Sequence, residues 1–238
     1  MIDEPEIELR NLRVHYGGRE VIHDINLRVE KGEFVAIVGK SGCGKSTLLN
    51  ALAGFIDKEG DVLLPANFGM IFQNYAVFPW LTVKGNILFG IDRERNAGDK
   101  IARLQLLLKM TDLTTEARKY PAELSGGQVQ RVALARALAR NPAVLLMDEP
   151  FGALDVYTRE KMQTWLLEVW EIEKQAIVFV THSIDEAIFL SDRVVVLGDG
   201  NILGSFRVPF GRPRAKALQF EVPFVELKKQ IMDLLEGS

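Results

Sequence analysis

Short apolar runs alternate with longer amphipathic stretches along most of the chain. Near the N-terminus, residues 6–14 and 21–30 alternate apolar and polar positions on either side of the turn sequence YGGRE. Alternation of this kind around a glycine turn predicts an antiparallel hairpin. The next run, FVAIV at Phe34–Val38, is continuously apolar, which predicts a strand buried on both faces.

This buried strand leads through a glycine-rich loop into KSTLLNALAG, which has a helical pattern. A similar order returns later: VLLMDEP precedes a predicted helix at 158–174, AIVFVTH precedes one at Ile184–Leu190, and RVVVLGDG follows. Strands and helices in this order predict an α/β fold with a mostly parallel core sheet covered on both faces.

The pattern changes between Gln73 and Pro142, where strand-like runs are replaced by segments such as KIARLQLLLKM with apolar residues at helical spacing. We therefore expect one domain over residues 1–238. Residues 1–72 and 143–210 would form the α/β core with its N-terminal antiparallel part, and 73–142 an inserted helical subdomain. Residues 211–238 would form a short tail that ends in a helix.

Composition narrows the class of protein. The 238 residues are 47% apolar and 26% charged, which suits a single large domain with a full core. The net charge of −3 gives no overall attraction to nucleic acid, so we expect no nucleic-acid partner. Every apolar run is shorter than the roughly 20 residues that span a bilayer. The acidic start MIDEPEIELR does not resemble a signal peptide.

The sequence GKSGCGKST at residues 39–47 follows a predicted strand and opens a predicted helix, as a phosphate loop does. Glycines would let the backbone N–H groups point inward, and the helix would add its positive N-terminus. Lys45 would neutralise the β- and γ-phosphates of ATP, and Ser46 would bind Mg²⁺. The expected nucleotide-binding residues of this phosphate loop are Gly39, Lys40, Ser41, Gly42, Cys43, Gly44, Lys45, Ser46 and Thr47.

Cys43 is the single cysteine, so an intrachain disulfide is excluded, as is usual for cytoplasmic proteins. We interpret it as a small filler within the loop. The alternative is a reactive thiol whose pKa is lowered by the helix N-terminus, in which case alkylation would block nucleotide binding.

Two adjacent acids, Asp148 and Glu149, end the apolar run VLLMDEP. Adjacent acids at the end of a buried strand are costly without a cation, and Mg²⁺ would supply one. Asp148 would hold the metal through its water shell, and Glu149 would act on the attacking water as general base. Taken alone, the pair also fits a solvated turn.

A second glycine loop, LSGGQ at residues 124–128, precedes the helical pattern VQRVALARALARNP. From the residues alone, Ser125 would cap the helix and the glycines would turn the chain. LSGGQ, then VLLMDEPFGALD, then VFVTHSIDEAIFLSDRVVVL follow the phosphate loop in an order that resembles the ATPase subunit of an ABC transporter, over essentially the whole chain.

The resemblance implies a head-to-tail dimer in which the second glycine loop of one copy meets the γ-phosphate held by the other copy. It implies that Tyr16 stacks on adenine and that Gln73 reaches Mg²⁺ and the water. Asp155 would cross the dimer interface, and His182 would contact the γ-phosphate. The expected residues of the second glycine loop are Ser125, Gly126, Gly127 and Gln128.

After Gln73 the chain reads NYAVFPWLTVKGNILFG, with Tyr75, Phe78, Trp80 and Leu81 close together. These residues form either local core or a groove for a helix of a membrane subunit. FPWLTV, EPFGALD and the tail start RPRAKAL resemble the importers of the nitrate, sulfonate and taurine group.

Membership of that group implies two permease subunits contacted through residues 73–81 and a separate solute-binding protein. It also implies a peripheral position on the cytoplasmic face of the inner membrane. Nitrate, alkylsulfonate, taurine, bicarbonate and pyrimidine-type vitamin precursors all stay open as cargo. Two departures weaken the subgroup: FIDKEGDVLLPANFGMIFQ is short, so the edge sheet is expected to be trimmed, and Val129 and Ser183 replace more polar or acidic residues.

Three alternatives stay open at this point. An exporter ATPase would share the chemistry. A soluble ABC ATPase of DNA repair or translation would need long coiled coils or a second ATPase domain, and the sequence contains neither sustained heptads nor a second phosphate loop of the same pattern. A kinase with a phosphate loop would leave LSGGQ without a role.

Overall fold

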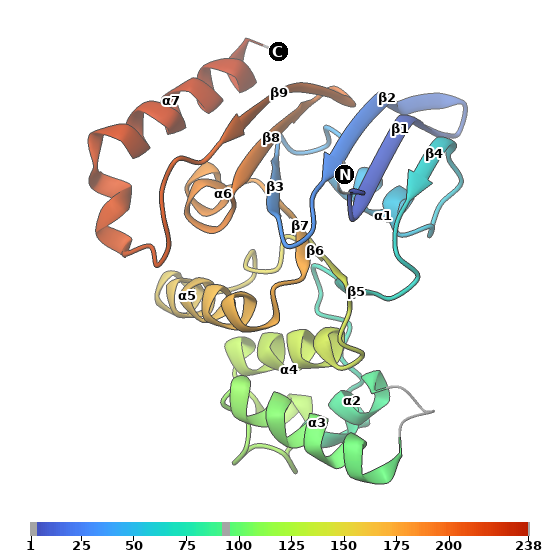
Figure 1. Ribbon diagram of the computed structural model, residues 1–238, viewed down its shortest axis with the longest axis vertical. Coiled ribbons are helices and arrows are strands. Elements are labelled where there is room, and N and C mark those ends of the chain that lie inside the picture. Colours follow the sequence, from blue (N-terminus) through green and yellow to red (C-terminus); the bar gives the residue numbers. More distant parts are fainter. Residues whose placement is uncertain (1–3, 92–95, 238) are drawn as a thin grey trace. The chain divides into compact units, whose positions relative to one another are not determined.

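The computed structural model describes residues 4–91 and 96–237 (Figure 1). Internal contacts divide the chain into two compact units. The first contains the residues up to Ala66 together with those from Gln175 onward, and the second contains Asn67–Lys174.

The first unit begins with an antiparallel sheet, in the order β2-β1-β4, made of β1 (Ile7–Tyr16), β2 (Arg19–Val29) and β4 (Glu59–Leu63). The predicted hairpin is confirmed, but its strands are longer than expected because Gly17 and Gly18, at φ 54° and 82°, make the turn by themselves. The segment before β4 is short, and β4 pairs with β1 over only a few residues.

The second sheet region of this unit is mostly parallel. Strand β3 (Phe34–Val38) pairs in parallel with β7 (Ala176–Thr181) and with β8 (Arg193–Gly198), and β9 (Asn201–Arg207) pairs antiparallel with β8. Every residue of β3 and β7 is buried, which explains their continuous apolar sequences. Strand β9 was not predicted, because its residues are only partly buried and lack alternation.

The helices of the first unit are α1 (Lys45–Leu52), α6 (Ile184–Leu190) and α7 (Val222–Glu236), with a short 3-10 helix η2 (Lys216–Phe220) before α7. The bounds of α6 are those predicted, and the tail ends in a helix as expected. Helix α7 packs against α6, β8 and β9 (Figure 1).

The second unit contains the parallel pair β5 (Phe68–Ile71) and β6 (Val144–Asp148). Its helices are α2 (Val83–Gly90), α3 (Ala97–Met110), the 3-10 helix η1 (Pro121–Glu123), α4 (Gly126–Leu138) and α5 (Val156–Glu173). Between Gln73 and Pro142 the described residues form helices and connections but no strand, so the helical character of this region is confirmed. Helix α5 begins before the predicted position 158 because Asp155 caps it.

Candidate functional site

The phosphate loop of the first unit lies between β3 and α1. Gly42 and Gly44 adopt φ values of 81° and 105°, which favour glycine, and Gly44 is the N-cap residue of α1. Glycine is required at position 39 for lack of space and not because of the backbone conformation expected from the sequence. A Cβ at this position would overlap the carbonyl oxygen of Leu197 and the Sγ atom of Cys43.

The Lys45 side chain lies inside this loop. It is 6% exposed, and its Nζ donates hydrogen bonds to the carbonyl oxygens of Gly39 and Lys40, each at 2.9 Å. The ammonium group is therefore held beside the N-terminus of α1. A cation and a helix N-terminus in one loop favour an anion.

Cys43 is 7% exposed. Burial raises the pKa of its thiol, and the charge of nearby Lys45 only partly opposes that shift. The alternative of a thiol pKa lowered by the helix N-terminus is therefore wrong, because desolvation of the thiolate dominates. The filler interpretation fits the packing, since the Cys43 carbonyl also accepts a hydrogen bond from the Gly200 N–H at 3.1 Å.

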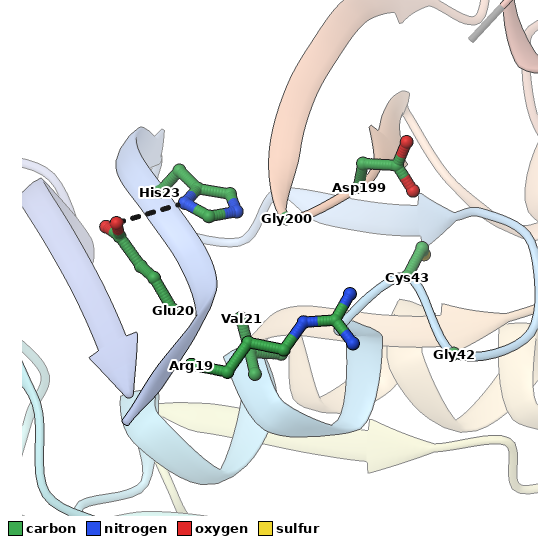
Figure 2. Close-up of a pocket in the computed structure, with 8 residues that line it drawn as sticks. All are labelled: Arg19, Glu20, Val21, His23, Gly42, Cys43, Asp199 and Gly200. Carbon is green, nitrogen blue, oxygen red and sulfur yellow. Dashed lines mark ion pairs between the residues drawn. The ribbon is translucent and has the colours of Figure 1, made fainter. Parts of the chain in front are cut away.

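A pocket of about 460 Å³ borders the phosphate loop (Figure 2). Figure 2 shows the Arg19 side chain extending from β2 toward the loop. His23 and Glu20, on the same strand, form an ion pair in which His23 Nδ1 lies 3.3 Å from Glu20 Oε2. The lining residues are Arg19, Glu20, Val21, His23, Gly42, Cys43, Asp199 and Gly200.

Tyr16, the expected adenine-stacking residue, is 52% exposed at the end of β1. It lines a different pocket of the same unit, about 420 Å³ in volume, together with Phe55 and Asp57. The structure therefore does not place Tyr16 in the pocket that Gly42 and Cys43 border.

His182 follows β7 directly and is exposed. The residues on either side of it are held by a partly buried hydrogen-bond network. The Thr181 hydroxyl accepts from the Ser183 N–H at 3.0 Å and donates to Glu186 Oε2 at 2.7 Å, and Ser183 Oγ accepts from the Glu186 N–H at 3.3 Å. Ser183, a departure from the family pattern, is thus the N-cap of α6.

The predicted acids lie at the end of β6 in the second unit. Asp148 is 8% exposed, and Glu149 adopts φ 42°, in the left-handed region that is uncommon for a residue with a side chain. The amide of Gln73, which follows β5, lies 3.5 Å from Glu149 Oε2. Because β5 and β6 run parallel, their carboxyl ends bring Gln73 and Glu149 together at one edge.

The chemistry of these donors fits a magnesium–nucleotide complex. Mg²⁺ in such complexes is held by one or two carboxylates, phosphate oxygens and water rather than by a full cage of side chains. Asp148 and Glu149 supply carboxylates, while residues 4–91 and 96–237 contain no cluster of three or more His, Cys, Asp or Glu side chains placed to hold a metal.

The second glycine loop begins α4 as predicted. Ser125 Oγ accepts from the Gln128 N–H at 3.3 Å, and Gln128 Oε1 accepts from the Ser125 N–H at 3.0 Å, which forms a capping box. A Cβ on Gly127 would lie 2.7 Å from Thr158 Cγ2, whereas one on Gly126 would meet no atom closer than 3.6 Å. Close packing of α4 on α5 therefore requires glycine at position 127.

Asp155 caps α5 beside this loop. Its carboxylate accepts from the Thr158 N–H at 3.0 Å, and that hydrogen bond lowers the pKa of Asp155. The starts of α4 and α5 border a pocket of about 420 Å³ that presents the cations Arg131 and Lys161. The pocket is lined by Ser125, Gly127, Gln128, Arg131, Tyr157, Thr158, Lys161 and Met162.

The aromatic segment after Gln73 divides into core and surface. The Tyr75 side chain is 8% exposed, so of the two alternatives the local-core interpretation holds for this residue. Trp80 is 69% exposed and lies 5.4 Å, between ring centroids, from Phe78, which also contacts the exposed Phe89 at 4.6 Å. The Arg136 guanidinium lies 5.0 Å over the Phe78 ring.

Sequence reasoning missed the residue that shapes this segment. Asn86 is fully buried; its Oδ1 accepts from the Phe78 N–H at 2.8 Å, and its Nδ2 donates to the carbonyls of Phe78 and Leu81 at 3.1 and 3.0 Å. Its only signal was a single asparagine in the helix VKGNILFG, whose other residues are apolar or glycine apart from Lys84.

Comparison with known proteins gives consistent matches. Residues 22–152 match the family model described as ABC transporter. The chain is 44% identical over 231 residues to the aliphatic sulfonates import ATP-binding protein SsuB 1 of Paracoccus denitrificans, covering 96% of this chain and 93% of that protein. It is 38% identical over 246 residues to the taurine import ATP-binding protein TauB of Escherichia coli, covering 95% of each.

Among solved structures, the chain is similar to the dimeric bacterial ABC transporter cassette MJ0796. The TM-score is 0.74 at 34% identity, over 86% of this chain and all of that one. The same cassette in a post-hydrolysis state with ADP and Pi matches with a TM-score of 0.73 at 32% identity. None of the helices in the described parts of this chain has the length and apolar character needed to cross a membrane.

Proposed function

The chain belongs to the ABC transporter family, and from this premise we propose that it is the ATPase subunit of an importer for a small sulfonate-like anion. The observation that carries the proposal is the 44% identity, over 96% of the chain, to an ATP-binding protein for import of aliphatic sulfonates. The 38% identity to a taurine import protein supports the same class of cargo, since taurine is itself a sulfonate.

ATP binds with its phosphates in the loop of residues 39–47. The Lys45 ammonium and the N-terminus of α1 meet the negative charge, and Gly42 and Gly44 allow the backbone N–H groups to face it. Support comes from the buried position of Lys45 within the loop. Tyr16 stacks on adenine, which requires the base to approach the exposed ring at the end of β1.

Hydrolysis uses the residues at the carboxyl ends of β5 and β6. Glu149 accepts the proton of the attacking water, and the Gln73 amide beside it orients that water. His182 contacts the γ-phosphate from the turn after β7. Bound Mg²⁺ would neutralise phosphate charge, with Ser46, Gln73 and Asp148 as the residues that hold it.

Two copies complete the site. In a C₂ head-to-tail dimer, residues 125–128 of one copy meet the γ-phosphate bound by the other, and Asp155 lies at the interface. The dimeric structure of the similar cassette MJ0796 supports the formation of a dimer. Binding of ATP then closes the dimer and hydrolysis releases it.

The aromatic cluster of Phe78, Trp80 and Phe89, with Leu81, forms the contact for two permease subunits. Large exposed aromatic side chains held in place by a buried asparagine favour a partner surface. A separate solute-binding protein delivers the anion, and the complex lies on the cytoplasmic face of the inner membrane. Nucleic acid is not a partner.

The test is growth of the source cell without this chain on taurine, or on an aliphatic sulfonate, as the sole sulfur source. The wild-type chain should restore growth and Lys45→Ala should not, while growth on sulfate stays equal. Equal growth of the deletion strain on every sulfonate would overturn the cargo class. Recovery of the tagged chain from membranes with a multi-span protein tests the permease partners independently.

Purified Glu149→Gln tests the hydrolytic centre. It should bind ATP as the wild type does but lose about a thousandfold in turnover, within the range of general-base catalysis. It should also dimerise with ATP and not with ADP, measured by size-exclusion chromatography. Glu160→Gln, an exposed acid on α5, is the matched control. Substantial turnover by Glu149→Gln would remove Glu149 as the base.

A further inference from the structure

The C-terminal end of α6 is satisfied by side chains from a distant part of the sequence. The last four carbonyls of an α-helix lack partners within the helix. In α6 the first of these, Ala187, accepts from the Ser191 N–H at 3.0 Å and from Ser191 Oγ at 2.7 Å. The carbonyls of Ile188, Phe189 and Leu190 require partners from elsewhere.

Those partners are Arg212 and Arg214, at the start of the tail. Arg214 Nη1 donates to the carbonyls of Ile188 at 2.8 Å and Phe189 at 3.0 Å, and Arg212 Nη2 donates to that of Leu190 at 2.7 Å. Arg214 Nη1 also reaches the carbonyl of Ser191 at 2.8 Å. Every carbonyl in the last turn of α6 is thereby satisfied.

The Arg214 side chain is buried and fully engaged in hydrogen bonds to backbone carbonyls. Its side chain is 8% exposed, and its Nε and Nη2 donate to the carbonyl of Phe210 at 3.2 and 3.0 Å. Burial, with the nearby charge of Arg212, lowers the pKa of Arg214 to about 10, so it remains charged at neutral pH. A cation at a helix C-terminus is also favoured by the helix dipole. Lysine has three N–H donors on one nitrogen and cannot reproduce this fork.

The tail also holds the other end of α6. Lys228 of α7 forms an ion pair at 2.8 Å with Asp185 in the first turn. His182 lies immediately before the N-cap residue Ser183, and α6 has only 7 residues, so about 10 Å of helix separates the two ends. His182 is therefore joined through Ser183 to a short helix whose last carbonyls are held by the tail.

We propose that Arg214, assisted by Arg212, is a positioning residue for ATP hydrolysis: the tail fixes α6 and through it the orientation of His182. This inference rests on the proposed function, since it assigns Arg214 an effect on turnover through the histidine that contacts the γ-phosphate. It gives the segment RPR a role in the catalytic cycle as well as in folding.

The experiment is a double-mutant cycle in the full chain. Arg214→Lys should lower kcat for ATP about tenfold, as expected for a small misplacement of a catalytic group, while the Kd for ATP changes less than about twofold. In the His182→Ala background, Arg214→Lys should lower kcat no further. Arg207→Met, which changes an exposed arginine of β9, is the control and should leave kcat unchanged.

Unchanged kcat in Arg214→Lys, or an equal loss with and without His182, would overturn the proposal while leaving the ATPase function intact. Full turnover by His182→Ala would overturn the role of His182 and this proposal together. No turnover by the wild type under any condition would instead overturn the proposed function. If Arg214→Lys does not fold, Arg212→Lys, which weakens the hydrogen bond to the Leu190 carbonyl and the ion pair with Asp192 but retains Arg214, is measured in the same cycle.

Discussion

The two glycine loops of this chain each lead into a helix, but the N-termini of the two helices are capped differently. At the phosphate loop, no described side chain caps α1, and the N-cap residue is Gly44 in the left-handed conformation. At the second loop, Ser125 and Gln128 form a capping box at α4. The first loop therefore begins its helix without a side-chain cap, and a buried lysine lies beside the helix N-terminus.

The second loop is structurally complete within its own chain. Its glycines serve other purposes than an inward curl, since Gly127 allows α4 to approach Thr158 on α5. A complete cap with an exposed serine agrees with the proposal that this loop meets the phosphate bound by another copy. The two glycine loops thus differ in their structural roles, and substitutions in each loop should affect different measured quantities.

The largest effect is expected at the phosphate loop. Lys45→Ala removes the cation that we propose binds the phosphates. Hydrogen bonds to charged groups contribute up to about 3 kcal/mol, so the affinity for ATP should fall about a hundredfold. Equilibrium binding of a fluorescent ATP analogue measures this. Lys229→Ala, at an exposed position of α7, is the control. Affinity near the wild-type value in Lys45→Ala would mean that the loop does not hold the phosphates.

The next largest effect is expected at the second loop, and on a different quantity. Ser125→Arg places a long cation where the partner's nucleotide must approach, so ATP binding should persist while dimer formation and turnover fall about a hundredfold. Ser125→Ala separates this from loss of the cap, which costs about 1 kcal/mol of stability. Normal turnover by Ser125→Arg would show that the two-chain site is wrong.

A smaller effect is expected at the glycine between α4 and α5. Gly127→Ala forces its Cβ against Thr158, so the free energy of unfolding should fall by about 1–3 kcal/mol. Gly126→Ala, with space around its Cβ, should change stability much less. Thermal unfolding measures both, and the added substitution Thr158→Ser should restore stability to Gly127→Ala. Equal losses at both glycines would contradict the packing argument.

The smallest effect concerns the thiol inside the phosphate loop. Because burial raises the pKa of Cys43, its alkylation by iodoacetamide at neutral pH should be slower than in the unfolded chain, and should rise with pH beyond the ordinary thiol range. The raised pKa adds stability that is present below the unfolded pKa of about 8.5 and is lost as pH rises through the folded pKa. Since Cys43 is the only cysteine, the labelling signal belongs to one site. Alkylation of the folded chain as fast as that of the chain unfolded in urea would contradict the raised pKa.

Several features could be predicted because their causes are local. The hairpin follows from alternation around a glycine turn, and the bounds of α6 follow from the helical segment after the apolar run AIVFVT. The cap at Ser125 needed only the next three residues. The subdomain boundaries at 72, 142 and 210 and the roles of the individual site residues stay predictions.

Other features could not be predicted because they depend on distant residues. The local sequence NYAVFPW does not distinguish core from surface, so both alternatives stayed open for Tyr75, which the structure buries. Strand β9 forms because β8 offers an edge, not because its own residues alternate. The helix N-terminus argued for an activated Cys43, but the surrounding packing buries the thiol and reverses the shift.

By itself, the sequence determined that this protein has a phosphate loop, an acidic strand end and a capped second glycine loop, because each is encoded within a few neighbouring residues. Only the tertiary structure decided that Asn86 holds the Phe78–Leu81 turn, that Gln73 lies beside Glu149, and that Arg214 completes α6. The physical reason is that an unsatisfied polar group is costly wherever it is buried, and the chain satisfies it with whichever side chain the fold brings near, however distant in sequence.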